Sequence, residues 1–368
     1  VDEAAGVKIL DGSAHGGTFA ADCVVIETDT GALVRCSAAD GNTRIYRSTD
    51  DGGTWSLRQT MNMPTAGGNG AKGAFIDSRR HLYFGCTEQS CTYENYASGY
   101  FGQIWKSTDD GLTWTKVCTS ETSAFWHFSE DTTGRVYVNE YSNVPTSGTE
   151  YPALNIWRSD TSGANFVKWH SATGESAPGL KDGVRHIHAV YVDSSDRVFA
   201  LYGDDSWGGL AGHCVRLNAA GTVDLDYGKF DNGMTSAIEG VSGAILLGAD
   251  RNPSGIDAIA PTAALSCRQC NFRAELPARM DAYVFDLLRG QDHVIWGQTT
   301  LSSRYPLMVF SLDDGANWHA MDLGEQQSTT ITINRSAPNA RIYLSGNPVR
   351  WIPAFSEAEL RAMLRRAA

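Results

Sequence analysis

The sequence predicts an all-β fold in which repeated four-stranded antiparallel sheets close into a ring. Three observations lead to this prediction: a short motif that recurs at a regular spacing, strand patterns that recur with it, and a strand pattern near the N-terminus that can complete the last sheet. Self-similarity with a period of about 20 to 50 residues is typical of repeat architectures. The 368 residues are therefore expected to form one domain, 1–368.

The recurring motif is Ser-x-Asp-x-Gly-x-Thr/Asn-Trp. Its copies are RSTDDGGTW (47–55), KSTDDGLTW (106–114), FSLDDGANW (310–318) and the weaker RSDTSGANF (158–166). The steps between the serines are 59, 52 and 152 residues, and the last is close to three steps of about 51. Two units between 166 and 310 are therefore expected to keep the spacing without the motif. Asp can accept hydrogen bonds from turn N–H groups, Gly permits positive φ, and Trp can pack a hairpin corner onto its sheet.

Seven segments have the pattern of innermost strands, because they are short, apolar and bounded by turn residues. They are residues 23–28, 72–77, 124–130, 186–192, 235–240, 281–286 and 329–334. Second strands follow after a turn, for example at 135–141 and 197–203. The last unit (329–353) supplies three strands, and the N-terminal strand 7–10 is expected to be its fourth, which leaves no exposed edge. A short helix is expected at 356–368.

The motif resembles the Asp-box, or BNR repeat, of sialidase-like β-propellers, a superfamily of carbohydrate-active enzymes. This resemblance implies an all-β β-propeller, and the seven innermost strands predict that it is seven-bladed, or six-bladed if one unit is misread. In that family the box lies on the hairpin between the third and fourth strands and is structural, so Asp50, Asp109 and Asp313 are expected to serve folding. The chain is not a typical sialidase, because the stretch before the first box, ALVRCSAADGNTRIYRS, lacks the Arg-Ile-Pro motif.

Charge and composition exclude some classes of partner. The chain has 30 Lys+Arg against 42 Asp+Glu, a formal net charge of −12, which argues against a nucleic-acid partner. No apolar run reaches the roughly 18 residues of a membrane span. A monomer is expected.

The eight cysteines predict disulfides and therefore an oxidising compartment. The predicted pairs are Cys23–Cys36 across a hairpin, Cys86–Cys91, Cys267–Cys270 and, from the remaining two, Cys118–Cys214. The spacing of Cys267 and Cys270 also fits a redox motif or half a zinc site. The protein is expected to be secreted or periplasmic.

The loops between second and third strands are expected to carry function, because propeller geometry opens them on one face, opposite the motif corners. Four are long: 86–102, 139–153, 203–213 and 249–257. They are rich in Tyr, Trp, Gly and acids, which suits sugars, since apolar sugar faces stack on rings and hydroxyls seek hydrogen bonds. The candidate substrate-binding residues are Lys72, Tyr93, Trp126, Glu140, Asp204, Asp205, Trp207, Arg251, Asp281 and Arg304.

The innermost strands add titratable groups. Alignment of these strands on a terminal Asp (Asp29, Asp77, Asp131, Asp193, Asp286) places Lys72, Trp126, His188 and Asp281 in one layer. His186 is expected one pleat above His188, and His127 on the face opposite to Trp126. The candidate catalytic residues are His127, Arg185, His186, His188 and Tyr141.

These residues favour cleavage of a uronate-containing polysaccharide by β-elimination. The reaction needs a base, an acid and a group that neutralises the carboxylate. The histidines supply base or acid, Tyr141 is a candidate proton donor, and Arg185 and Arg251 can pair with the carboxylate. Some polysaccharide lyases use seven-bladed propellers with His, Tyr and Arg in the central cleft, and this chain is similar to that layout in fold and residue type.

Two alternatives remain open. A glycoside hydrolase needs a carboxyl pair, which can come from Glu94, Glu140, Asp204, Asp205, Glu239 and Asp281. A non-catalytic propeller would bind a glycan or a protein. No cofactor is expected: His186 and His188 can chelate a metal with His213 or Asp204, but this spacing alone is a weak signal.

Overall fold

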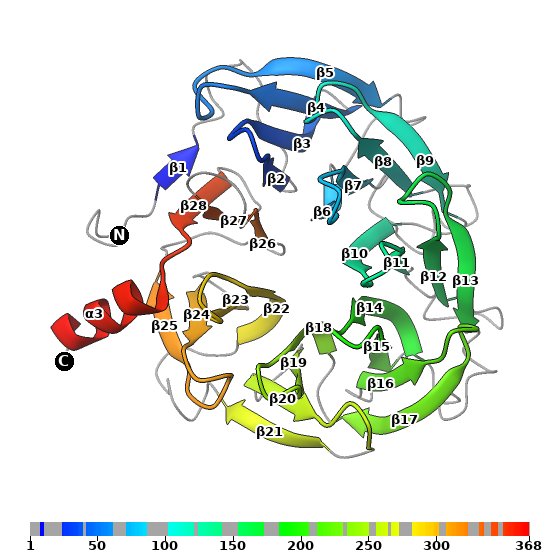
Figure 1. The fold of residues 1–368 in the computed structure, drawn as a ribbon, viewed down its shortest axis with the longest axis vertical. Helices are drawn as coiled ribbons and strands as arrows, with labels where there is room; N and C mark the ends of the chain where they lie inside the picture. Colours follow the sequence, from blue (N-terminus) through cyan, green and yellow to red (C-terminus); the bar gives the residue numbers. More distant parts are fainter. Residues whose placement is uncertain are drawn as a thin grey trace.

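The computed structural model describes residues 8–10, 24–39, 42–61, 71–86, 102–120, 124–141, 154–172, 184–205, 212–230, 234–249, 255–263, 266–271, 282–301, 307–322, 331–334, 340–344 and 349–367. They form seven four-stranded antiparallel sheets, arranged as blades around a central axis (Figure 1). The predicted seven-bladed β-propeller is therefore confirmed, and six blades are excluded.

The first four blades follow the chain in order, and each runs from the axis to the rim (Figure 1). Blade 1 contains β2 (Val24–Glu27), β3 (Leu33–Ala39), β4 (Asn42–Ser48) and β5 (Ser56–Met61). Blade 2 contains β6 (Ala71–Ile76), β7 (Leu82–Cys86), β8 (Gln103–Ser107) and β9 (Thr115–Thr119). Blade 3 contains β10 (Ala124–Glu130), β11 (Val136–Tyr141), β12 (Leu154–Ser159) and β13 (Val167–Ala172). Blade 4 contains β14 (Val184–Val192), β15 (Val198–Asp205), β16 (Gly212–Leu217) and β17 (Val223–Phe230).

The remaining blades complete the ring, and the last one joins both ends of the chain. Blade 5 contains β18 (Met234–Glu239), β19 (Ile245–Ala249), β20 (Gly255–Ile259) and β21 (Ser266–Asn271). Blade 6 contains β22 (Ala282–Arg289), β23 (Ile295–Leu301), β24 (Leu307–Ser311) and β25 (His319–Asp322). Blade 7 contains β26 (Ile331–Ile333), β27 (Arg341–Leu344), β28 (Val349–Pro353) and the N-terminal β1 (Lys8–Leu10).

One helix, α3 (Glu357–Ala367), follows blade 7 and projects from the ring (Figure 1). Leu360 is fully buried in the apolar cluster of blades 6 and 7, which holds the start of the helix against the propeller. At 11 residues, α3 is too short to cross a membrane, and no other described segment forms a helix that is long and apolar enough to do so.

The hydrophobic core is divided among the seams between neighbouring blades. At the first seam, for example, Val34 and Ile45 of blade 1 pack with Leu82 and Phe84 of blade 2. Comparable clusters join blades 3 and 4 and blades 5 and 6. Burial of apolar surface therefore holds the blades together, while the backbone ladders run only inside each blade.

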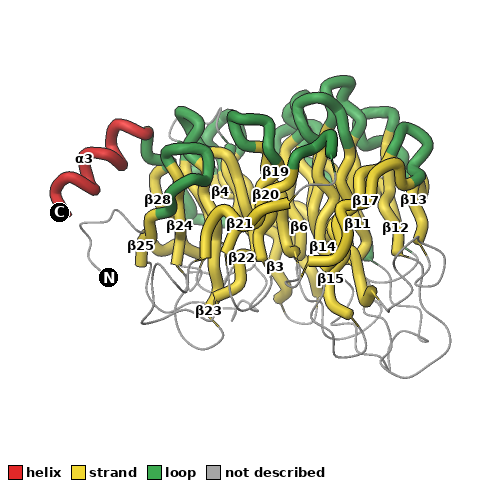
Figure 2. The backbone as a smooth tube through the Cα atoms, turned by 90° about the horizontal axis from the view of Figure 1, so that it is seen from below, coloured by secondary structure: helices red, strands yellow, loops and turns green. Residues whose placement is uncertain are grey.

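The two faces of the ring differ in their connections. The described turns that join a first to a second strand, or a third to a fourth strand, lie on one face, drawn in green in Figure 2. We call this the tight-turn face. The connections between second and third strands leave from the opposite edge of the sheets, which we call the long-loop face. The four copies of the repeated motif lie on the tight-turn face, at the outer turns of blades 1, 2, 3 and 6.

The first Asp of each good motif copy closes its own turn. In blade 1, Asp50 accepts hydrogen bonds from the Thr54 N–H and hydroxyl at 2.8 and 2.6 Å and from the Ser48 hydroxyl at 2.7 Å. The Ser48 oxygen in turn accepts the Gly52 N–H at 2.9 Å. The same bonds recur around Asp109 and Asp313. These carboxylates are therefore committed to the hairpin corners.

The turn bonds also shift the pKa values of these carboxyl groups. The hydrogen bonds from Thr54 and Ser48 lower the pKa of Asp50 to about 2. At Asp109 burial raises the pKa, but the hydrogen bonds from Thr113 and Ser107 outweigh it, so the pKa is below its ordinary value of 3.8. Burial is likewise outweighed at Asp313, whose pKa is lowered by Asn317 and Ser311.

The next residue of the motif ties each turn to the preceding blade. Asp51, Asp110, Ser162 and Asp314 all have a left-handed backbone, with φ between 53° and 62°. The Asp110 carboxylate accepts hydrogen bonds from Arg47 and Thr30 of blade 1. Asp314 accepts the N–H groups of residues 241 and 242 in blade 5, the Ser162 carbonyl accepts from Tyr83 and Lys106 in blade 2, and Asp51 pairs with Arg341 of blade 7.

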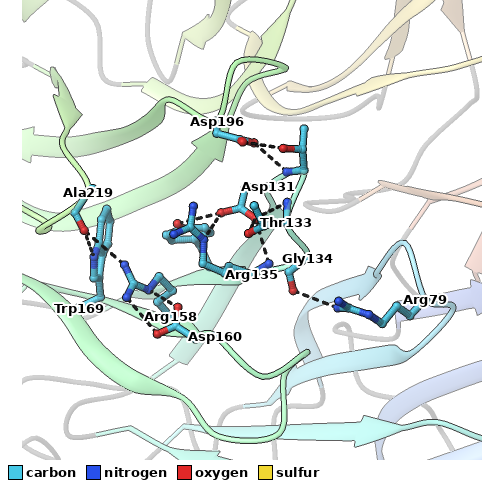
Figure 3. A network of polar contacts seen from close by, with 12 residues as sticks. Arg79, Asp131, Thr133, Gly134, Arg135, Arg158, Asp160, Trp169, Asp196 and Ala219 are labelled. Carbon is cyan, nitrogen blue, oxygen red and sulfur yellow. Dashed lines mark hydrogen bonds and ion pairs between the residues drawn. The ribbon is translucent and has the colours of Figure 1, made fainter.

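Blades 4 and 5 lack the motif but keep the tie through carbonyl groups. The Ala219 carbonyl accepts hydrogen bonds from Arg158 and Trp169 of blade 3, as Figure 3 shows. The Pro261 carbonyl accepts from Arg216 and Tyr227 of blade 4. The outer turns of blades 1 to 6 therefore each clasp the blade before them.

The turns between first and second strands, near the axis, add a second set of hydrogen bonds between blades. Asp131 accepts from Thr133 and Arg135 within its own turn in blade 3. The Asp196 carboxylate of blade 4 accepts the N–H and hydroxyl of Thr132 of blade 3 (Figure 3). Ser78 and Ser194 bind Glu130 and Glu239 across two other seams in the same way.

The predicted cysteine pairing is wrong wherever the thiols are described. Cys118 and Cys214 are reduced thiols in separate clusters of blades 2 and 4, so they do not pair with each other. Cys36 and Cys86 are also reduced, and their sulfur atoms lie 3.7 Å apart, so neither is joined to the partner predicted for it. Cys23 and Cys91 lie outside the described residues, as do the side chains of Cys267 and Cys270.

The turn carboxylates predict a defined dependence of stability on pH. Because the pKa of Asp109 is lowered in the folded state, its contribution to stability is complete above its ordinary pKa of 3.8 and is lost as the pH falls through the lower folded-state value. We expect Asp109→Asn to lower the free energy of unfolding by about 1 kcal/mol at pH 7, and this difference to disappear towards pH 2. Urea unfolding at several pH values measures it.

Asp292→Asn is the control, since Asp292 is an exposed turn residue. It should have little effect at any pH. A deficit in Asp109→Asn that stays constant down to pH 2 would contradict the assignment.

The clasp at Asp110, meaning the hydrogen bonds that its carboxylate accepts from Arg47 and Thr30, can be separated from the backbone strain at this residue. Gly is relaxed at the φ of 61° and removes the carboxylate, whereas Ala removes the carboxylate and also bears the left-handed backbone. We expect Asp110→Gly to lose about 1 kcal/mol of stability through the clasp, and Asp110→Ala to lose about 1 kcal/mol more.

Thermal or urea unfolding measures both. Asp292→Gly, at an exposed residue with φ 49°, reports the backbone effect alone. A change in stability in Asp110→Gly equal to that in Asp292→Gly would show that the clasp contributes nothing.

Candidate functional site

Five of the seven innermost strands carry a β-bulge at the same level. The register shifts fall between Ala71 and Gly73, Phe125 and Phe128, Ile187 and Ala189, Met234 and Ser236, and Val284 and Asp286. The bulge residues are therefore Lys72, Trp126 with His127, His188, Thr235 and Phe285. A bulge bends its strand and re-aims a side chain, and bulges are over-represented beside active sites.

In blade 6 the residue in the same layer as Lys72, Trp126 and His188 differs from the one predicted. Lys72, Trp126 and His188 share the layer, each five residues before the turn residues Asp77, Asp131 and Asp193. In blade 6 the equivalent turn residue is Gly290, whose N–H binds the Val294 carbonyl at 2.8 Å. The alignment on Asp286 is therefore wrong by four residues, because Asp286 lies inside β22 and Phe285 occupies the layer. Asp281 lies outside the described residues.

The bulge in β10 also changes the position of His127. Instead of facing opposite sides, the Trp126 and His127 rings stack on each other, with centroids 5.1 Å apart and planes 26° apart. The prediction that they point to opposite faces is wrong, because the extra residue breaks the two-residue alternation of the strand.

A cavity of about 410 Å³ runs along the propeller axis and is lined by the innermost strands of all seven blades. Glu27, Trp126, His127, Ser236 and Asp286 are among its polar lining residues. His127 Nε2 lies 3.8 Å from Asp286 Oδ1, so side chains of blades 3 and 6 meet across the channel. Asp286 also accepts the N–H groups of Leu287 and Ile331, which fixes its carboxylate.

His127 and His188 each bind a carbonyl group of the next blade. His127 Nδ1 lies 2.8 Å from the His188 carbonyl oxygen, and His188 Nδ1 lies 2.7 Å from the Met234 carbonyl oxygen. A carbonyl can only accept, so Nδ1 carries the proton in both rings, and the lone pair of the neutral ring is on Nε2. Backbone groups of blades 4 and 5 therefore set the tautomer and the orientation of these histidines.

Asn139 satisfies the backbone groups at two bulges. It is fully buried in β11, its Oδ1 accepts the His127 N–H at 2.9 Å, and its Nδ2 donates to the Ile187 carbonyl at 2.7 Å. The side chain thereby bridges blades 3 and 4 next to both histidines. Sequence reasoning did not select Asn139, because its role depends on two register shifts that leave no pattern in the sequence.

Trp126, Tyr141 and His188 form a group of rings at the long-loop end of blades 3 and 4, which we call the aromatic cluster. The Tyr141 ring packs edge-on against Trp126 at 4.7 Å and parallel to His188 at 5.9 Å, with an angle of 13° to the latter. Tyr141 is the last residue of β11, where a long connection begins, and it is half-buried, whereas His188 is 3% exposed. The hydroxyl-bearing Tyr141 is therefore nearer the surface than the imidazole.

Gly203 makes room for His188. A Cβ atom on Gly203 would lie 2.0 to 2.4 Å from three atoms of the His188 ring, too close for any side chain. The glycine therefore allows the ring to lie flat on β15. A glycine inside a strand often marks such a close approach, and this was the available signal for its role.

Other candidate residues lie apart from the aromatic cluster or outside the described residues. The Glu140 carboxylate is fully buried and accepts hydrogen bonds from Asn155 and Trp157, which hold it inside blade 3. Glu239 binds Ser194 on the tight-turn face, and His213 Nε2 lies 2.6 Å from Asp226. Within the described residues no group of three His, Cys, Asp or Glu side chains can hold a metal ion.

For a further set only the backbone is described: Lys72, Arg185, His186, Asp204 and Asp205. His186 pairs with Gly203, which places it on β14 directly opposite the glycine under His188. Several candidates lie wholly outside the described residues: Tyr93, Glu94, Trp207, Arg251, Asp281 and Arg304.

The sequence matches no protein-family model and no curated protein. Among solved structures it is similar to YCF48 from Cyanidioschyzon merolae, with 12% identity, a TM-score of 0.57, and 95% of this chain and 99% of that chain covered. It is also similar to a chain of the mitotic checkpoint complex, with 10% identity, a TM-score of 0.58, and 90% and 89% covered.

A third similar structure is the extracellular domain of a hybrid two-component system from B. thetaiotaomicron, with 8% identity and a TM-score of 0.56. The match covers 91% of this chain but only 39% of that one. At these identities the similarity extends to the propeller fold alone.

The contact between Gly203 and His188 predicts strong coupling between the two positions. Gly203→Ala should lower the free energy of unfolding by about 2 kcal/mol, because the methyl group overlaps the imidazole. In the double variant with His188→Ala, the methyl group fits the space that the ring leaves. We therefore expect the double variant to be as stable as His188→Ala alone, a coupling of about 2 kcal/mol in urea unfolding. Additive losses would show that the ring does not lie on Gly203.

Proposed function

We propose that the protein binds an acidic, uronate-containing polysaccharide at the long-loop end of blades 3 and 4 and cleaves it by β-elimination. The observation that carries the proposal is the pairing of Tyr141 with His188, whose rings are parallel at 5.9 Å beside Trp126. The pair offers an acid and a base within one group of rings. The resemblance of the repeated motif to the Asp-box of carbohydrate-active propellers supports a glycan as the substrate.

His188 is suited to act as the base. Its Nδ1 is fixed on the Met234 carbonyl, so Nε2 is the nitrogen that can take up a proton. In the proposed step, Nε2 removes the C5 proton of the uronate, the electron pair forms the C4–C5 double bond, and the bond between C4 and the leaving oxygen breaks. The Tyr141 hydroxyl gives its proton to that oxygen.

The remaining requirement is neutralisation of the uronate carboxylate. Arg185 lies on β14 three residues before His188, and a guanidinium group can bind a carboxylate with two parallel hydrogen bonds. We assign this role to Arg185, with Arg251 as a second candidate. His186, on the same strand, is the alternative base.

Hydrolysis with a carboxylate pair is less well supported. Glu140, one candidate acid, is enclosed by Asn155 and Trp157 and accepts hydrogen bonds from both. A non-catalytic glycan-binding propeller is the second candidate function. The hydrogen bonds of His127 and His188 to carbonyl groups of the next blade favour it. A role in joining the blades would explain both histidines without any catalysis.

An activity assay with matched variants tests the proposal. The protein is incubated with a panel of uronate polysaccharides, and the ultraviolet absorbance of the unsaturated product is followed. His188→Asn keeps a donor at the position of Nδ1, and hence the bond to Met234, but removes Nε2. Tyr141→Phe keeps the ring contacts but removes the hydroxyl. We expect each to lower turnover about 100-fold or more, with affinity for the polysaccharide little changed.

His170→Asn is the control. His170 Nδ1 also binds a carbonyl, that of Gly221 at 2.6 Å, but it lies in the rim strand β13. Its variant should retain wild-type turnover. Reducing ends without absorbance would indicate hydrolysis instead, and binding without any product would indicate a glycan-binding module. Full activity of both site variants would reject the assigned residues.

A further inference from the structure

Two buried thiols from different blades face each other at the first seam. Cys36 lies in β3 of blade 1 and Cys86 ends β7 of blade 2, 50 residues further along the chain. Both are 0% exposed, and their Sγ atoms are 3.7 Å apart. The other two described thiols, Cys118 and Cys214, lie in clusters of different seams.

The backbone around both thiols is held by ladders on two sides. Cys36 pairs with Val24 and Ile45, and Cys86 pairs with Ala71 and Gln103. Cys86 is therefore opposite the residue that precedes the β6 bulge. The pair lies at the level where other seams have hydrogen bonds from one blade to a carbonyl of the next, such as His188 to Met234 and Thr332 to Val25.

We propose that Cys36 and Cys86 are a modification site at which oxidation forms a disulfide between blades 1 and 2. A disulfide has an S–S length of about 2.05 Å, so each sulfur has to move by about 1 Å or less, which is within reach of a small side-chain rotation. This inference stands on the thiol geometry and is independent of the proposed function.

The oxidant is a small disulfide such as oxidised glutathione. One cysteine thiolate attacks it and forms a mixed disulfide, releasing the first small thiol; the second cysteine thiolate then attacks the protein sulfur of the mixed disulfide and releases the other. Both electrons and both protons end on the two small thiols. Because Cys36 and Cys86 are fully buried, the exchange takes place before the seam closes during folding, or when the seam opens.

The bond would make the first seam covalent. The contacts described at the other seams are apolar packing and polar ties, and separation of any two blades opens the ring. A cross-link over 50 residues restricts the unfolded chain and therefore stabilises the folded ring.

The test is oxidative refolding followed by peptide mapping. The full chain is refolded with oxidised and reduced glutathione or with an excess of reductant, remaining thiols are alkylated in denaturant, and the digest is examined by mass spectrometry. We expect a peptide pair joined through Cys36 and Cys86 in the oxidised sample only. Alkylation of both residues after oxidative refolding, or a link from either one to a different cysteine such as Cys23 or Cys91, would overturn the proposal.

Thermal unfolding gives a second readout. The oxidised wild type should melt about 5 °C above the reduced form, and this difference should vanish in Cys36→Ala and in Cys86→Ala. Cys214→Ala, which removes an equally buried thiol from blade 4, is the matched control and should keep the difference. An equal difference in the Cys36 and Cys86 variants would overturn the proposal even if those variants are less stable overall.

Discussion

The blades of this propeller are joined to one another by side chains, because no backbone ladder crosses from one sheet to the next. Apolar packing in the seams supplies most of the attraction, but it has no direction and would tolerate sliding of one blade on its neighbour. Polar ties remove that freedom. They lie at two levels: the outer turns clasp the preceding blade on the tight-turn face, and side chains near the axis bind carbonyls of the next blade.

The ring closes at the seam between blades 7 and 1, where the N-terminal strand β1 joins the last blade. Strand β1 completes the last sheet by pairing with β28. Beside it, Arg341 of blade 7 pairs with Asp51 and lies 3.9 Å from Glu27, and Thr332 binds the Val25 carbonyl. Burial raises the pKa of Glu27 above its ordinary value, and the charge of Arg341 and the hydroxyl of Tyr343 counteract only part of this rise.

The sequence was sufficient for the number of blades and the position of their innermost strands, because apolar periodicity and turn residues are local signals. It also assigned the first Asp of each motif to the turn. The second Asp was missed, because its role depends on what the preceding blade presents to it. Asp110 meets an arginine, whereas Asp314 meets two backbone N–H groups.

The errors near the axis have two physical origins. A bulge adds one residue to a strand, so every residue before it changes face relative to simple alternation. That single effect moved His127 beside Trp126. In blade 6 the strand was aligned on Asp286, which lies inside β22, whereas the turn residue is Gly290. The cysteine pairing failed for a related reason: thiols close in sequence were favoured, while Cys36 meets a thiol from another blade.

The histidines show why structural ties and chemistry need not compete for the same residue. An imidazole has two nitrogens, and the architecture uses Nδ1 of His188 to hold blade 4 on blade 5. That bond fixes the ring plane and leaves the lone pair on Nε2, which is the preorganisation that a base needs. Blade 3 supplies Trp126 and Tyr141 on the other side of the ring, and Gly203 supplies the space beneath it. The geometry around His188 therefore exists only when blades 3, 4 and 5 are in register, so the ties that close the propeller also determine the site proposed for its chemistry.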